Sequence, residues 1–446
     1  MLIKTSAWAL LVIALLAMGM GVESPSLLAF AKDALLSQPA SDNTASNGFF
    51  MIGAESALLM DAETGTVLWE QNGYLRRSMA STTKIMSAMV LMEKGKLTDR
   101  VAVSQRAVDT EYAYLLEAGE HLTLLELLQA MLICSANDAA VAAAEHVYGS
   151  EAKCVARMNH KARQLGARDT HFMNVHGLYD PDHYTTAHDL ALIAREAMKR
   201  PLFRELVSTK ATKIPWEGHP GGRVIENRNH LLKSDLGVDG IKTGFVNDSG
   251  HCLVFSVNRG GCHLIGVLLK SPNIWQDART MIWQAFQDFQ PQIFAAPGAP
   301  VRRPEVGGGT VDRVPVYTKA RLAAFVPTRG RNPYQFHCQI DSLSAPLSKG
   351  EYAGRARLYL NGKVIRSLPL YIARPVGRTS WATLYFIIRT VFLLFLLGVI
   401  AAYACRAFAK ASLRRRRRLA AQVRGADPYR ASLSQRQRRY GTGNQG

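Results

Sequence analysis

The chain has 446 residues, which exceeds one ordinary domain and is long enough to bury a large core. Its 54 Lys and Arg residues against 35 Asp and Glu residues give a formal net charge of +19. Six scattered cysteines exclude a small fold built on a dense disulfide framework.

The N-terminal residues predict a secretory signal. Lys4 precedes an apolar run from Ala7 to Met20, and a small-residue cleavage site follows at Ala29-Phe30-Ala31. Residues 1–31 are therefore interpreted as a cleaved signal peptide, with a retained membrane anchor as the alternative. Residues 32–49 are rich in Ser, Ala and Asn and are expected to form a flexible leader.

The first motif with chemical meaning is Ser81-Thr82-Thr83-Lys84. Positions i and i+3 of a helix share a face, so Lys84 is expected beside Ser81. Residues 85–92 are almost wholly apolar and predict a buried helix that ends at Gly95. Burial and a nearby cation such as Lys242 would lower the pKa of Lys84, so that its amine takes the proton of Ser81. The alternative is that Ser81 only caps the helix while Lys84 is solvated.

The second motif is Ser135-Ala136-Asn137. A mostly apolar helix that starts near Leu124 is interrupted there and resumes as an alanine-rich helix through Glu145. A tight turn between two helices would present Ser135 as a proton relay and the Asn137 amide as support for Lys84 and the substrate. The alternative is an ordinary interhelical turn with a helix cap.

The third motif, Lys242-Thr243-Gly244, opens a predicted β-hairpin. The turn is expected at residues 258–261, with Val257 opposite Cys262. Gly244 is expected to let the substrate backbone approach the strand, and Lys242 to offer a positive charge to a carboxylate. The alternative is a lysine on an edge strand near a turn. Together, the three motifs in this order are typical of an active-site serine acyl-transfer enzyme.

The composition changes after Phe286. Residues 295–309 are rich in Pro and Gly and predict a linker, whereas Asn361-Gly362 between alternating residues predicts a type I′ hairpin. Residues 291–376 are therefore expected to form a β-rich domain. Because this domain has little titratable chemistry, we interpret it as a spacer or an interaction module.

The C-terminal residues predict a membrane anchor. Residues 380–405 are apolar apart from Arg389 and a few small polar side chains, and they suit one transmembrane helix. Residues 406–446 carry twelve Lys and Arg residues against Asp427 alone, which is +11 of the net +19. This asymmetry predicts a basic cytoplasmic tail, an extracytoplasmic catalytic domain and contact with membrane lipid. Nucleic-acid binding by the tail is the alternative, and we expect no nucleic-acid partner.

One group of residues has the composition of a metal site. His176, His183 and His188 occur near Asp180 and Asp182, but no H-E-x-x-H motif is present. These residues are better interpreted as loop and helix-cap residues. We expect no metal and no other cofactor.

The chain resembles the low-molecular-weight penicillin-binding proteins of the D-alanyl-D-alanine carboxypeptidase family. Besides the three motifs, the resemblance rests on four further blocks, Asp61-Ala62-Glu63-Thr64-Gly65, Asn174-Val175-His176-Gly177-Leu178, Asn227-Arg228-Asn229-His230-Leu231-Leu232 and Ser249-Gly250. It covers residues 50–290 closely, which we take as the catalytic domain, and continues more loosely to about residue 370. The resemblance implies an α+β fold, with an antiparallel sheet flanked by helices around a central nucleophile helix, followed by a small β-rich domain.

The resemblance also implies residue roles. Ser81 would be the acyl-ester nucleophile and Lys84 the general base, with Ser135 as proton relay and Asn137 as positioning residue. The substrate-binding residues would be Lys242, Thr243 and Gly244, and the backbone N–H groups of Ser81 and Phe245 would form the oxyanion hole. One departure is Ile274, which stands where the family often has an arginine; Arg279 is a possible substitute.

The function implied by the resemblance is a serine-type D-Ala-D-Ala carboxypeptidase. It would remove the terminal D-alanine from peptidoglycan stem pentapeptides and would be inhibited by β-lactam antibiotics. The alternatives are a β-lactamase or endopeptidase of the same superfamily, or a non-catalytic membrane sensor of penicillin or muropeptides.

Overall fold

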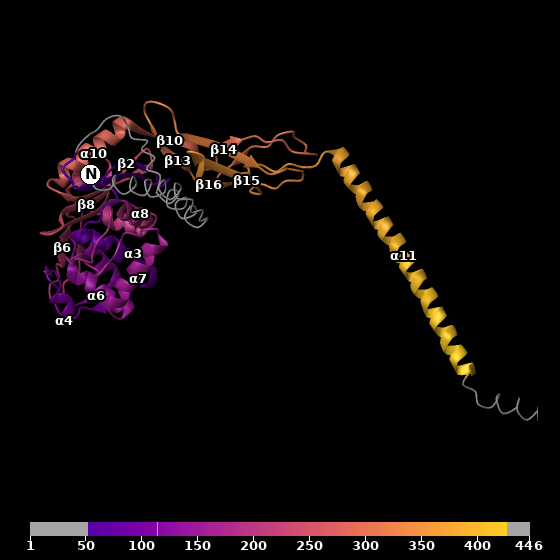
Figure 1. Ribbon diagram of the computed structural model, residues 1–446, viewed down its shortest axis with the longest axis horizontal. Coiled ribbons are helices and arrows are strands. Elements are labelled where there is room, and N and C mark those ends of the chain that lie inside the picture. Colours follow the sequence, from indigo (N-terminus) through magenta and orange to yellow (C-terminus); the bar gives the residue numbers. More distant parts are fainter. Residues whose placement is uncertain (1–51, 114, 426–446) are drawn as a thin grey trace, which may run out of the picture.

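The computed structural model describes residues 52–113 and 115–425 (Figure 1). The predicted signal peptide, the leader and residues 426–446 of the basic tail lie outside the described residues. The described part comprises a domain of mixed α and β structure, which is the expected catalytic domain, a β-rich domain and a long C-terminal helix. The α+β fold class expected from the sequence is confirmed.

A five-stranded sheet lies at the centre of the catalytic domain. Its strands follow the order β2 (Val67–Gln71), β1 (Ser56–Asp61), β9 (Cys262–Ser271), β8 (Gly250–Arg259) and β7 (Val238–Val246). Every neighbouring pair is antiparallel. Strand β7, which carries the third motif, therefore lies at an edge of the sheet.

Helices cover both faces of this sheet. Most of them pack on one face together with short strands, and α10 packs on the other face. The elements are η1 (Ala80–Thr83), α3 (Lys84–Lys94), β3 (Arg100–Ala102), α4 (Gln105–Val108), β4 (His121–Thr123), α5 (Leu124–Gln129), η2 (Ala130–Cys134), α6 (Asn137–Tyr148), α7 (Glu151–Gln164), α8 (Ala187–Ala197), α9 (Pro201–Ser208), β5 (Ala211–Ile214), β6 (Arg223–Glu226), η3 (His230–Lys233) and α10 (Ile274–Asp288).

The strands are apolar on both faces because both faces are covered. In β1, Leu58 and Met60 belong to the core under the larger helical layer, whereas Ala57 and Leu59 belong to the core under α10. This division follows from the alternation of side chains along a strand. Helix α3 lies inside the larger core, with Ile85 to Leu91 buried along its length.

The β-rich domain contains two sheets around a core of its own. A two-stranded sheet pairs β10 (Phe289–Ala295) with β13 (Leu322–Pro327). A five-stranded sheet has the order β11 (Pro300–Arg302), β12 (Val316–Tyr317), β16 (Lys363–Ile372), β15 (Tyr352–Leu360) and β14 (Tyr334–Ile340).

The structure tests two local predictions in this domain. Asn361 and Gly362 have φ angles of 49° and 77° and join Leu360 to Lys363 across a two-residue loop, so the type I′ hairpin is confirmed. The prediction of a linker over residues 295–309 was wrong in part. Strand β11 lies inside that segment, because it pairs with β12 at the edge of the larger sheet.

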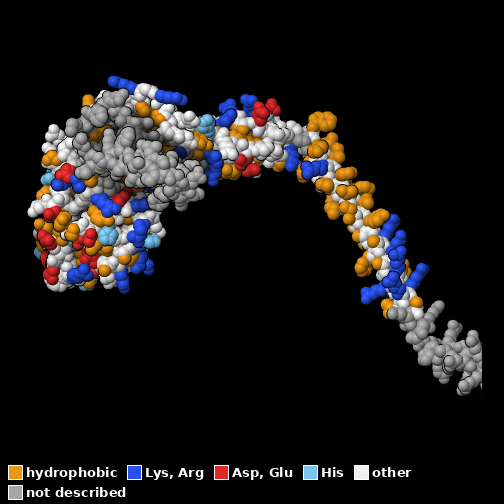
Figure 2. Space-filling model, in the orientation of Figure 1, with side chains coloured by type: hydrophobic (Ala, Val, Ile, Leu, Met, Phe, Trp, Pro, Cys, Tyr) orange, Lys and Arg blue, Asp and Glu red, His pale blue; other side chains and the backbone are white. Residues whose placement is uncertain are grey.

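The C-terminal helix α11 runs from Ser380 to Gly425 and extends away from the β-rich domain (Figure 1). Its first part carries exposed hydrophobic side chains, and Lys and Arg side chains gather toward its end (Figure 2). It is the one helix of the described residues that is long and apolar enough to cross a membrane. Helix α11 is therefore a candidate membrane anchor.

Candidate active site

Ser81 lies in the short 3-10 helix η1, immediately before α3. The side chains at i and i+3 are nearly eclipsed in a 3-10 helix, so this geometry places Lys84 directly beside Ser81. The chain enters η1 through Ala80, whose φ of 48° is in the left-handed region. Ser81 is half-buried, while Lys84 is fully buried.

The Lys84 amine is held by three oxygen atoms. Its Nζ lies 2.9 Å from Oγ of Ser81 and 2.7 Å from Oδ1 of Asn137. The main-chain oxygen of His176 is the third partner, also at 2.7 Å. Burial lowers the pKa of Lys84 well below its ordinary value, and the charge of Lys242 lowers it further. The predicted pairing of Ser81 with a lysine of lowered pKa is therefore present in the structure.

The second motif follows an irregular helical turn. After α5 the chain widens into the π-helix η2, and Ser135 then takes a left-handed conformation with φ of 71° and ψ of 27°. Asn137 begins α6, and its Nδ2 donates to the main-chain oxygen of Glu111 at 2.8 Å. This bond fixes the amide so that its oxygen faces Lys84.

The third motif lies against the first. A Cβ atom added to Gly244 would lie only 2.8 Å from the backbone nitrogen of Ser81, and Gly177 has a similar close approach to the main-chain oxygen of Ala80. The expectation that Gly244 makes room for substrate was therefore incomplete. The glycine is required first because β7 passes next to the backbone of η1.

Lys242 is 2 % exposed, and its Nζ donates to the main-chain oxygen of Thr243 at 3.0 Å. Burial, together with the charge of Arg228, lowers the pKa of Lys242 to about 7. Two lysines of lowered pKa therefore lie in one site, as expected where burial and like charges act together. Such perturbed groups concentrate at functional sites.

A cleft of about 550 Å³ joins the three motifs. Six of the residues predicted from the sequence line it, namely Ser81, Ser135, Asn137, Thr243, Gly244 and Phe245. Lys84 and Lys242 are buried in the wall of the domain rather than at the surface of the cleft. The structure thus brings all the predicted site residues to one place.

Several further residues of the cleft were missed by the sequence reasoning. Arg228 lines the cleft and is exposed, whereas Arg279, the suggested substitute for a missing arginine, is not among the lining residues. His230 and Trp275 also line it, with their rings stacked at a centroid distance of 4.8 Å. The Asn227–Leu232 block was a usable signal, because it places Arg228 and His230 beside the third motif.

The histidines of the metal-like cluster have other partners. Nε2 of His183 lies 2.7 Å from Oγ1 of Thr83, and its Nδ1 accepts from the backbone of Met173 at 3.0 Å. Nδ1 of His176 accepts from the backbone of Leu178 at 3.2 Å. Within residues 52–113 and 115–425, no group of three or more His, Cys, Asp and Glu side chains is arranged to hold a metal ion.

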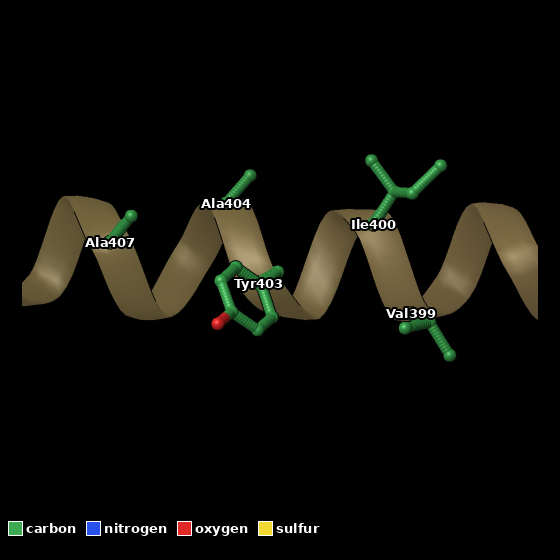
Figure 3. Close-up of a pocket in the computed structure, with 5 residues that line it drawn as sticks. All are labelled: Val399, Ile400, Tyr403, Ala404 and Ala407. Atoms are coloured by element: carbon green, nitrogen blue, oxygen red, sulfur yellow. The ribbon is translucent and has the colours of Figure 1, made fainter.

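A second hollow lies on helix α11 (Figure 3). It is lined by Val399, Ile400, Tyr403, Ala404 and Ala407, which follow one another along a single exposed helix. The hollow contains no titratable group suited to acid–base or nucleophilic chemistry near neutral pH. It belongs to the candidate membrane span, not to the catalytic machinery.

The site defines the class of protein. A serine hydroxyl next to a buried amine of lowered pKa, an amide that holds the amine, and a lysine-bearing edge strand form a serine acyl-transfer site. The family of D-alanyl-D-alanine carboxypeptidases, peptidase S11, matches residues 41–273. The C-terminal domain of penicillin-binding protein 5 matches residues 289–378.

Individual relatives agree with these matches. The chain is 30% identical to the D-alanyl-D-alanine carboxypeptidase DacF of Bacillus subtilis, over 74% of this chain and 87% of the relative. It is 31% identical to DacA of Escherichia coli, over 74% of this chain and 85% of the relative. The structure is similar to penicillin binding protein 5 from Haemophilus influenzae, with a TM-score of 0.59 and 26% identity, covering 75% of this chain and 100% of that chain.

The chain belongs to the D-alanyl-D-alanine carboxypeptidase family of serine peptidases. The resemblance inferred from the sequence motifs is confirmed, as is the activity it implied, that of a serine carboxypeptidase in peptidoglycan metabolism.

Proposed function

We propose that the chain removes the terminal D-alanine of peptidoglycan stem pentapeptides through an acyl-enzyme on Ser81. The observation that carries this proposal is the contact of Ser81 Oγ with the buried Nζ of Lys84, at 2.9 Å. Ser81 attacks the carbonyl of the penultimate D-alanine, the terminal D-alanine leaves, and water then hydrolyses the ester.

Lys84 acts as the general base in its neutral form. A neutral amine has two N–H donors and one lone pair, and Lys84 faces two oxygen atoms that only accept, Oδ1 of Asn137 and the main-chain oxygen of His176. If the two N–H groups are donated to these oxygens, the lone pair faces the hydroxyl of Ser81. Asn137 and His176 therefore orient the base, and its lowered pKa keeps the lone pair free.

Ser135 relays the proton toward the leaving amine from its position on the cleft wall. The backbone N–H groups of Ser81 and Phe245 stabilise the oxyanion, since Phe245 follows the glycine that lies against the backbone of η1. Lys242 and Thr243 hold the terminal carboxylate, and Arg228 adds a cation on the same cleft. Because β7 is an edge strand, an extended stem peptide can lie along it as an added strand.

The proposal includes two further partners, β-lactam antibiotics and membrane lipid. A β-lactam would acylate Ser81 as a substrate analogue and remain bound because its opened ring stays attached. Helix α11 would anchor the chain in membrane lipid, with the catalytic domain outside and the arginine-rich end inside.

Mass spectrometry of the purified full chain tests the proposal. Benzylpenicillin is expected to label one peptide, at Ser81, and pentapeptide is expected to be converted to tetrapeptide. Ser81→Ala should abolish both while Ser208→Ala, an exposed serine outside the cleft, should change neither. Labelling without turnover would favour a sensor, rapid release of hydrolysed penicillin would favour a β-lactamase, and a label elsewhere would exclude Ser81 as nucleophile.

A further inference from the structure

A further cavity lies between the catalytic domain and the β-rich domain, and no residue of the three motifs lines it. Its volume is about 300 Å³. Helix α8 and the start of α9 contribute Arg195 and Arg204, while the β-rich domain contributes Arg321 and Arg366. We call this space the interdomain cavity. It shares no lining residue with the active-site cleft.

The lining carries more positive than negative charge. Four arginines and Lys199 face a single lining carboxylate, that of Glu63. Glu63 is shared, because its Oε1 lies 3.1 Å from Arg321 and its Oε2 lies 3.4 Å from Arg366. Lys199 is paired outside the cavity with Glu196, at 2.7 Å. Among the residues that the structure describes, Arg195 and Arg204 have no carboxylate in ion-pair contact.

Main-chain oxygen atoms hold these arginines in place. Nε of Arg195 donates to the main-chain oxygen of Ala62 at 2.7 Å, and its Nη2 donates to the main-chain oxygen of Glu63 at 3.1 Å. Nη1 of Arg204 donates to the main-chain oxygen of Met198 at 2.7 Å. Carbonyl acceptors orient a guanidinium but do not neutralise it, and the carboxylates near Arg195, those of Asp61, Glu196 and Glu63, are fewer than the five cations of the lining. The cavity therefore keeps an excess of positive charge. Burial and the neighbouring charge of Arg366 lower the pKa of Arg195, which is the direction that crowded cations produce.

We propose that the interdomain cavity binds a phosphate group carried by a soluble ligand, between Arg195 and Arg204 of the catalytic domain and Arg366 of the β-rich domain. Arginine offers a planar fork of donors that matches phosphate oxygens in pairs, and several guanidiniums around one cavity favour a small, highly charged anion. A bound phosphate also offsets the repulsion among the arginines. The ligand would then connect the two domains.

The position of the cavity favours a soluble ligand over a membrane headgroup. The β-rich domain lies between the catalytic domain and helix α11 (Figure 1). Lipid headgroups around α11 are therefore at the far end of the β-rich domain from the cavity.

The test is isothermal titration calorimetry of the full chain with inorganic phosphate, in discs of phosphatidylcholine at low ionic strength. One saturable site is expected, together with a rise in the melting temperature. Arg204→Gln should weaken phosphate binding about tenfold or more, the usual cost of losing a charge-assisted hydrogen bond. Arg331→Gln, which removes an exposed arginine outside the cavity, should leave it unchanged.

Glu63→Gln separates binding from a purely structural role. If the arginines exist to pair with Glu63, this variant loses stability and gains nothing. The proposal expects tighter phosphate binding, because the one lining carboxylate that repels the anion is gone. Penicillin labelling of Ser81 reports that each variant is folded. Absent binding, or equal binding by wild type and Arg204→Gln, overturns the proposal. So does loss of phosphate binding in phosphatidylglycerol discs, which would assign the cavity to a lipid headgroup.

Discussion

At the scale of single residues, the charge state of Lys84 decides whether Ser81 can react. Arginine keeps its positive charge at any working pH and cannot provide a lone pair. Lys84→Arg is therefore expected to lose acylation almost as fully as Lys84→Ala, by about a hundredfold or more. Stopped-flow measurement of penicillin acylation checks this, with circular dichroism to establish folding. Substantial acylation by the arginine variant would show that Lys84 acts through its charge and not as a base.

Lys242 gives the site a second dependence on pH. Its pKa is lowered to about 7 by burial and by Arg228, and its protonated form is the one that attracts a carboxylate. Carboxylate binding should therefore be strong below about pH 7 and weaken above it. We expect kcat/KM to fall by about tenfold per pH unit on the alkaline side.

Lys242→Arg is the matched variant, because it keeps the positive charge at every pH in the profile. Its activity at pH 7 can be lower, but the alkaline fall between pH 7 and 9 should disappear. An unchanged alkaline fall in this variant would assign the titration to another group.

At the scale of elements, a chain of hydrogen bonds holds η1 in position. The backbone N–H of Met173 donates to Nδ1 of His183, so Nε2 carries the proton and donates to Oγ1 of Thr83. Thr83 in turn donates to the main-chain oxygen of Ala80, at 2.8 Å. A loop before α8 thereby fixes the turn that carries Ser81.

This network predicts a loss of stability in acid. Burial lowers the pKa of His183 to about 4, while an unfolded chain binds a proton near pH 6.5. Above about pH 6.5, His183 is neutral in both the folded and the unfolded protein. As the pH falls from there toward 4, only the unfolded chain binds the proton, so the free energy of unfolding decreases. The expected loss from His183 is about 1.4 kcal/mol per pH unit.

Urea unfolding followed by tryptophan fluorescence at pH 7, 6 and 5 measures this slope. His183→Gln cannot titrate, and it should be less stable at pH 7 but show a shallower decline with falling pH. Parallel curves for the two proteins would contradict the pKa assigned to His183. His176, whose pKa is lowered to about 3, contributes in the same direction in both proteins.

The sequence predicted elements well where one local rule dominates. The apolar run after Lys84 and the stop at Gly95 correctly gave α3, because burial and a helix terminator act on neighbouring residues. The turn after β8 was predicted two residues too long, because Val257 lies opposite Leu264 and not opposite Cys262. Gly260 and Gly261, with φ of 59° and 76°, form a two-residue loop that pairs Arg259 with Cys262.

In the active site, too, local rules predicted some contacts and not others. The spacing of Ser81 and Lys84 was enough to predict their contact, since both lie in one helical turn. The role of the His176 oxygen and the position of Arg228 were not predictable by local rules, because tertiary packing brings them to the site. The need for Gly244 also became clear only when β7 was placed against η1.

At the scale of the whole molecule, strand β13 makes the two domains one structural unit. Ala323 and Phe325 pack into the core beneath α10, whereas Leu322, Ala324 and Val326 pack into the core of the β-rich domain. The backbone N–H of Phe325 also donates to Oδ2 of Asp61, at 3.2 Å. Alternate side chains of one strand thus serve both cores, which limits rotation of the catalytic domain on its support.

The last prediction concerns the orientation of this assembly in a membrane. Arg414–Arg418 lie beyond the apolar part of α11, whereas only Arg374 and Arg378 lie just before the helix. Basic residues are retained on the cytoplasmic side, so the catalytic domain should face outward. Protease added to intact protoplasts is expected to remove the domain before Ser380, while a tag placed after Gly446 stays protected.

Replacement of the five arginines 414–418 by glutamine provides the control. This variant should retain carboxypeptidase activity, since the cleft and its three motifs lie far from α11 in the chain, but hold the tag inside less completely. Digestion of the tag in intact protoplasts of the unaltered chain would contradict the single span. The arginines at the end of α11 would then serve a purpose other than setting the orientation, such as binding anionic lipid.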